Sequence, residues 1–127
     1  MAEKVAKFRF SGYKITDGHI QIDPDRIANK QLNVTFDKTA GVNDGERKMR
    51  LLLVAKIVDD NNVINIQVKA EGYFEFDGDL SEEERSVFFN TSAPAILFPY
   101  VRAYISTLSS LSGITPVILP TLNLSNR

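Results

Sequence analysis

Apolar and polar residues alternate strictly along one stretch of the chain, from Ile64 to Phe76. The even-numbered positions carry Ile, Val, Ala, Gly or Phe, whereas the odd-numbered positions are almost all polar. Because successive side chains of a β-strand point to opposite faces, this pattern predicts a strand with one buried face and one solvent-facing face. Gly72 interrupts the row of apolar side chains, and we expect a bulge or bend of the strand there.

Two segments upstream predict further strands of the same sheet. Residues 49–58 are apolar on both faces, which is typical of a central strand. The turn-forming residues 59–62 follow, so this segment and the alternating strand should form a β-hairpin. A shorter alternating segment at residues 32–36 predicts a third strand.

The N-terminal part of the chain predicts a long first strand with an irregularity. Phe8 and Phe10 share one face of this strand, while Tyr13 and Ile15 share another. The phase of the alternation therefore shifts at Gly12, which indicates a β-bulge.

The pattern becomes helical after residue 79. Ser81 precedes three glutamates and predicts a helix N-cap, and Pro94 opens a second, longer helix that ends at Gly113. Two prolines keep the apolar segment 114–120 from continuing the helix. The expected apolar stripe of the long helix has 4-3-4-3 spacing and consists of Leu97, Val101, Tyr104, Leu108 and Leu111. Residues 1–127 thus predict a single α+β domain, a four-stranded antiparallel sheet followed by a long helix.

Composition and charge exclude several classes of function. Fifteen basic and sixteen acidic residues leave a net charge of -1, so the chain lacks the basic field that nucleic-acid binding needs. No apolar run approaches the ~18 residues that span a bilayer, and the N-terminus lacks the apolar stretch of a signal peptide. Together with the absence of cysteine, this predicts a cytoplasmic protein.

The residue supply also argues against catalysis. The chain has no cysteine, and His19, its only histidine, falls in an expected exposed turn, after which residues 19–22 either extend the first strand or pair separately. We therefore expect no metal site built from thiolates or imidazoles, no cofactor and no enzymatic activity, since phosphate-binding and dinucleotide motifs are also missing. The acidic cluster at 77–82 has its glycine at the second position rather than the sixth, so it fits a solvated turn better than a calcium loop.

The apolar segment after the long helix is more informative. Residues 114–122 are rich in Ile, Val and Leu on a backbone stiffened by prolines. Such a segment either caps a core or lines an exposed groove, and a contiguous exposed apolar patch would indicate a partner.

Residues 95–102, Ala-Ile-Leu-Phe-Pro-Tyr-Val-Arg, resemble the "ILFPYxR" helix of the SecB family of protein-export chaperones. The similarity continues through residues 105–108, the Gly113 stop and the proline-flanked segment 116–124. Upstream, residues 72–76 resemble the end of the family's third strand. The resemblance implies the same fold that the residue pattern predicts.

The resemblance also implies a function. Members of the family are ATP-independent holdases that bind unfolded precursor polypeptides in apolar grooves and deliver them to the SecA motor. They assemble as dimers of dimers with the long helices between the dimers, which here would use Tyr100, Tyr104, Thr107 and Leu108. The client groove would be bordered by two loops, represented here by Ile27, Leu32, Ile114, Val117, Ile118 and Leu119.

Some features differ from the export members of the family. The chain ends at Arg127, without the family's full second helix and SecA-binding tail, so we expect weak or absent SecA binding. On the expected SecA-docking face, Asp17 retains one acidic charge, but Asn65 and Gln67 stand where acids are expected. Two alternatives stay open: a chaperone dedicated to one partner such as an antitoxin, and a carrier of a small ligand.

Overall fold

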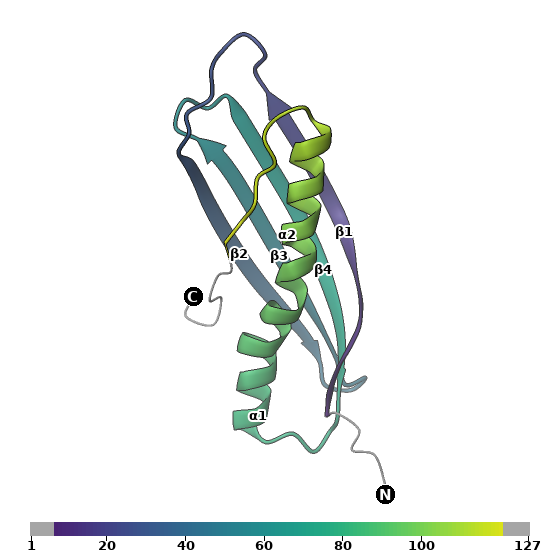
Figure 1. The fold of residues 1–127 in the computed structure, drawn as a ribbon. Coiled ribbons are helices and arrows are strands. Elements are labelled where there is room, and N and C mark those ends of the chain that lie inside the picture. Colours follow the sequence, from purple (N-terminus) through teal and green to yellow (C-terminus); the bar gives the residue numbers. More distant parts are fainter. Residues whose placement is uncertain (1–6, 121–127) are drawn as a thin grey trace, which may run out of the picture.

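The computed structural model describes residues 7–120, which form one four-stranded sheet and a helical layer on one of its faces (Figure 1). This arrangement confirms the predicted α+β fold. The elements in chain order are β1 (Phe8–Ile22), β2 (Leu32–Asn43), β3 (Lys48–Asp59), β4 (Ile64–Phe76), α1 (Glu82–Val87), the π-helical turn η1 (Phe88–Ser92) and α2 (Ala93–Leu111).

The strands lie in the order β1-β4-β3-β2, and every neighbouring pair is antiparallel. Two hairpins, β2–β3 and β3–β4, place β3 and β4 in the centre. Residues 23–31 connect the two edge strands, β1 and β2, by crossing one end of the sheet (Figure 1). We call these residues the crossover loop.

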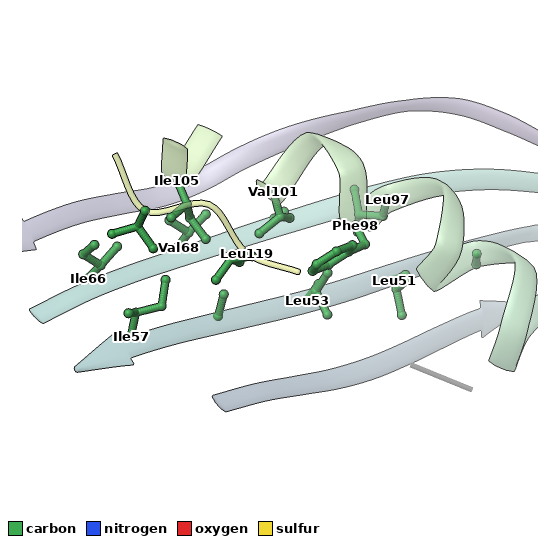
Figure 2. Packing of buried hydrophobic residues seen from close by; sticks show 14 of the residues in the cluster. Leu51, Leu53, Ile57, Ile66, Val68, Leu97, Phe98, Val101, Ile105 and Leu119 are labelled. Atoms are coloured by element: carbon green, nitrogen blue, oxygen red, sulfur yellow. The ribbon is translucent and has the colours of Figure 1, made fainter. Parts of the chain in front are cut away.

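The helix-facing side of β3 and β4 forms the core. Alternate residues of both strands are buried beneath α2, as the period-2 pattern predicts (Figure 2). The largest side chains of this layer that lie below 2% exposure include Phe74, Met49, Leu51, Leu53, Ile57, Leu97, Ile105 and Leu119. The other face of the sheet carries mostly polar side chains, and none of the helices within residues 7–120 covers it (Figure 1).

The predicted bulge in β1 is confirmed at Gly12, whereas no bulge occurs at Gly72. The β1–β4 register shifts between Phe10 and Gly12, and Gly12 has a φ of 140°, which a residue with a Cβ rarely adopts. Gly72 instead pairs in register with Leu51 of β3. A Cβ placed on Gly72 would lie 3.2 Å from a methyl carbon of Leu97, so this glycine lets α2 approach the sheet.

Two boundaries differ from the predictions. Strand β2 continues from Phe36 to Asn43, because these mostly exposed residues pair in register with the first half of β3. His19 lies within β1 rather than in a turn, since a second register shift between Ile15 and Asp17 lets the strand continue. Neither effect follows from the polarity of the residues concerned.

The helical run begins at the predicted cap. Ser81 and Glu84 form a reciprocal capping box: the Ser81 hydroxyl accepts from the Glu84 N–H, and the Glu84 carboxylate accepts from the Ser81 N–H, both at 3.1 Å. Pro94 lies in the first turn of α2, as predicted. Because Pro94 has no N–H, the carbonyl of Asn90 lacks its helical donor, and Lys38 of β2 donates to that oxygen at 3.2 Å.

The predicted apolar stripe of α2 is partly wrong. Tyr104 and Leu108 are only partly buried, and Leu111 is 83% exposed. The buried row consists of Leu97, Val101, Ile105 and Ser109, at strict four-residue spacing. A four-residue row is inclined to the helix axis, so the contact line of α2 follows the twist of the sheet beneath it.

We predict that Gly72→Val lowers the free energy of unfolding by about 1–3 kcal/mol, because the added carbons collide with Leu97 and force α2 away from the sheet. Urea denaturation measures this difference. The matched control is Gly41→Val on β2, where an added Cβ meets no atom within 4 Å. Equal stability of the two variants would contradict the close approach of α2 at Gly72.

Candidate functional site

Exposed apolar side chains occur on three segments next to the part of the sheet that α2 leaves open. Ile27 of the crossover loop is 89% exposed and Ile118, beyond α2, is 67% exposed. Val34 and Val42, on the helix-facing side of β2, are each about two-fifths exposed. Strand β2 lies at the edge of the sheet away from β1, while α2 packs on β1, β3 and β4 (Figure 1). Apolar side chains are therefore exposed at several points around β2, the strand that α2 covers least.

The crossover loop is positioned by a buried carboxylate. Asp59 accepts hydrogen bonds from the N–H of Val63 and of Ile64, each at 2.7 Å, and from the N–H of Asn29 at 2.8 Å. Burial of Asp59 favours a raised pKa, but these backbone donors outweigh it and hold the pKa below its usual value. The same carboxylate thus closes the β3–β4 turn and fixes the loop that presents Ile27.

The segment after α2, residues 114–120, is positioned by a buried hydroxyl. We call this segment the strap. Gly113 has a φ of 87° and lets the chain leave the helix. The Ser109 hydroxyl then accepts from the Val117 N–H at 2.8 Å and donates to the carbonyl of Ile105, also at 2.8 Å. Val117 and Leu119 are buried, whereas Ile118 points outward between them.

The predicted groove residues fall into three environments. Ile27 and Ile118 are exposed, and Leu32 and Ile114 are partly buried against the core. Val117 and Leu119 belong to the core, with Leu119 only 1% exposed, so they do not line an open surface in this conformation. Val34 and Val42 were not predicted as part of this surface. The alternation of residues 32–42 places Val34 and Val42 on the same face as Leu32, but only if the predicted strand is extended beyond Phe36.

The residues predicted for an oligomer interface lie on or near the outer side of α2. Tyr100 and Thr107 are exposed; Tyr100 stacks on Tyr13 of β1 with a centroid distance of 4.2 Å. The ring of Tyr104 lies over Gly18 of β1. Tyr104 and Leu108 are both partly buried. The exposed positions of α2 include the small, uncharged residues Ala95, Ala103 and Ser110, and near its end the large Leu111. This outer side of α2 is compatible with close packing of a second helix.

Asp17 lies on the open face of the sheet and already has partners. Its carboxylate accepts from Gln67 at 3.0 Å and lies 3.5 Å from His19 Nδ1. The hydrogen bond from Gln67 is the main cause of its lowered pKa. Lys69 is its cross-strand neighbour. The Asp17 carboxylate is therefore surrounded by Gln67, His19 and Lys69 and does not belong to an acidic patch.

Within residues 7–120 no group of three or more His, Cys, Asp or Glu side chains is placed to hold a metal ion. In the same part of the chain, no helix has the length and apolar character needed to cross a membrane.

Comparison with known proteins identifies sequence relatives. The family described as "Preprotein translocase subunit SecB" matches residues 19–126. An uncharacterised protein of Methanocaldococcus jannaschii, MJ0357, is 29% identical over 92% of this chain and 79% of its own length. The protein-export protein SecB of Saccharophagus degradans is 32% identical over 59% of this chain, and that of Cellvibrio japonicus is 33% identical over 58%. These two matches span less than half of each curated SecB protein, 44% and 43%.

A solved structure has the same fold. The Mycobacterium tuberculosis Rv1957 SecB-like chaperone, in complex with a ChAD peptide from the Rv1956 HigA1 antitoxin, superposes with a TM-score of 0.74. The similarity covers 91% of both chains at 14% sequence identity, which establishes the likeness of fold.

We predict that Asp59→Asn destabilises the protein at neutral pH, because an amide cannot accept three backbone hydrogen bonds as the carboxylate does. The folded-state pKa of Asp59 lies below its unfolded value, so this stabilisation is present above the unfolded pKa and is lost as the pH falls through the folded pKa. Urea denaturation of both proteins should give a stability difference that is large at pH 7 and shrinks on acidification below the ordinary carboxyl range.

The exposed Asp25 provides the control for this experiment, as Asp25→Asn. A difference between wild type and Asp59→Asn that stays constant with pH would contradict the role given to the ionised Asp59 carboxylate.

Proposed function

The chain belongs to the SecB family, and we propose that it is an ATP-independent holdase that binds unfolded precursor polypeptides and keeps them competent for export. The observation that carries this proposal is the apolar surface of the crossover loop, β2 and the strap. Ile27 and Ile118 expose large apolar side chains on two loops beside the partly covered strand β2, and such exposed apolar surface supports binding of a partner.

The proposed binding needs no catalytic group. Apolar contact stabilises a complex by about 25 cal/mol per Å² of buried surface and requires no particular client sequence. One short contact is weak once the loss of client entropy is subtracted. Several such surfaces on one assembly, engaged by one flexible chain, raise the affinity through effective concentration. Binding of the unfolded state then retards client folding by mass action.

A second candidate function is a chaperone dedicated to one partner. The similarity of fold to a SecB-like chaperone bound to an antitoxin peptide supports this candidate. The surroundings of Asp17 also support it, since this one acid of the expected SecA-docking site already has Gln67 and Lys69 beside it. A dedicated chaperone would protect one partner only. A small-ligand carrier, the third possibility, would ignore unfolded chains altogether.

The test is the refolding of a slow-folding, chemically unfolded precursor at increasing ratios of this protein. We expect retarded recovery of native signal, suppressed light scattering and a soluble complex of defined mass by size exclusion. Absence of any effect on several unfolded precursors would exclude a general holdase. Protection of a single partner encoded nearby would then favour the dedicated chaperone.

We predict different effects for substitutions at two neighbouring strap residues. Ile118→Asp should weaken client binding about tenfold and leave the stability unchanged, because this side chain is exposed and contributes only to a complex. Leu119→Asp should lower the free energy of unfolding by more than about 3 kcal/mol, because it places a charge in the core. Urea denaturation and client titration separate these effects. Normal client binding by a folded Ile118→Asp protein would contradict the proposed surface.

We further propose that the protein is cytoplasmic and assembles as a dimer of dimers through the outer side of α2. The small, uncharged side chains there allow helices of two copies to approach closely. Tyr100 and Tyr104 would add aromatic area at the border of this contact.

We predict that Thr107→Arg reduces the mass of the assembly, because a large charged side chain cannot be accommodated between closely packed helices. Sedimentation velocity measures the change. The control is Thr39→Arg, the same substitution at an exposed position of β2. If both variants sediment like wild type, α2 is not the contact between the copies.

A further inference from the structure

The strap covers an apolar slot between α2 and the sheet, although few interactions fasten it there. Leu119 points from the strap toward the sheet, and Figure 2 shows it among core side chains of α2 and β3. Among the described residues, the strap makes one hydrogen bond, from the Val117 N–H to Ser109. It pairs with no strand, and Pro116 and Pro120 have no N–H to offer.

The neighbouring elements are held much more firmly. Strand β2, for example, pairs with β3 over its whole length, from Leu32 to Asn43. The strap depends on the Ser109 hydroxyl and on three apolar side chains, of which Val117 and Leu119 are buried and Ile114 is partly buried. Segments with few buried contacts and few hydrogen bonds open at a free energy well below that of global unfolding. The strap can therefore leave the slot while the sheet and α2 stay folded.

The strap also has the pattern of an unfolded client. Its apolar side chains enter the slot at positions i and i+2, from Val117 and Leu119, while Ile118 between them faces outward. The segment is extended and non-helical. Any unfolded polypeptide with apolar residues at alternating positions can present the same two side chains with the same spacing.

We propose that the strap is an internal competitor of the client, held in place by Ser109 and displaced when an extended segment with alternating apolar residues enters the slot. This inference rests on the proposed function and adds a minimum requirement that a client must meet in order to bind. A client must supply at least two suitably spaced apolar side chains to replace Val117 and Leu119. A single exposed apolar residue on a folded protein cannot displace the strap.

The experiment uses the full chain and a fluorescent peptide with the strap's sequence, residues 113–120, that is N-methylated at the valine corresponding to Val117, so that the peptide cannot donate to Ser109 as the strap does. Ser109→Ala removes the acceptor of the strap's hydrogen bond and leaves a good helix former in its place. We expect hydrogen exchange at the Val117 amide to accelerate, and the peptide to bind about 3- to 10-fold more tightly than to wild type, as expected for the loss of one internal hydrogen bond. A peptide with serine in place of Val117 and Leu119 should not bind.

Ser112→Ala is the matched control, since the Ser112 hydroxyl donates to Leu108 and makes no bond to the strap. A second variant, Leu119→Ala, weakens the strap without touching Ser109 and should also tighten peptide binding. The proposal is overturned if Val117 exchange does not accelerate in Ser109→Ala. It is equally overturned if exchange accelerates and peptide affinity stays the same or falls.

A parallel measurement separates this inference from the proposed function. Wild-type protein is titrated with reduced, carboxymethylated α-lactalbumin, which cannot fold. Binding of that chain, together with no response to Ser109→Ala, would leave the holdase intact and reject only the competing strap. Failure of wild type and Ser109→Ala alike to bind either probe would reject both.

Discussion

One helix is too narrow to cover a sheet of four strands. This difference in width determines which apolar side chains of the sheet stay exposed. Four strands at about 4.8 Å spacing make a face of roughly 19 Å, whereas a helix with its side chains is about 10–12 Å across. Because Gly72 has no side chain, α2 approaches β4 closely. The helix packs on β1, β3 and β4, and β2 lies at the edge of the area that the helix covers. The chain nevertheless keeps apolar residues such as Val34 on that side of β2. The exposed apolar surface is thus a consequence of the architecture.

Two buried polar groups then determine the shape of this surface. Asp59 fixes the crossover loop through Asn29, and Ser109 fixes the strap through Val117. Each of these two side chains accepts hydrogen bonds from backbone N–H groups that would otherwise be buried without a partner. Both side chains are therefore held in one position. Ile27 and Ile118 therefore project outward from loops whose position is set by a hydrogen bond to a buried side chain. The two loops differ in how firmly they are held: Asp23 and Ile27 of the crossover loop make further hydrogen bonds to Val63 and Asn61, whereas the strap has only the bond to Ser109 among the described residues.

The sequence predicted those parts of the fold that depend on local pattern. Alternation in β4, the cap at Ser81 and the start of α2 at Pro94 each follow from a few neighbouring residues. The full length of β2 was not predictable, because its polar half is a strand only through pairing with β3. The burial of Val117 and Leu119 depends on a long-range hydrogen bond for the same reason. A signal did exist: Ser109 continues the four-residue row of Leu97, Val101 and Ile105, and a buried hydroxyl in an apolar row requires a partner.

We propose that unfolded chains bind the exposed apolar side chains around β2, the crossover loop and the strap. Nuclear magnetic resonance of the isotope-labelled protein, titrated with a permanently unfolded client, tests it most directly. We expect the signals of Ile27, Ile118 and Val34 to shift or broaden. The signals of Asp17 and Gln67, on the open face of the sheet, should stay unchanged. Perturbation confined to the open face, or no perturbation by any unfolded client, would contradict it.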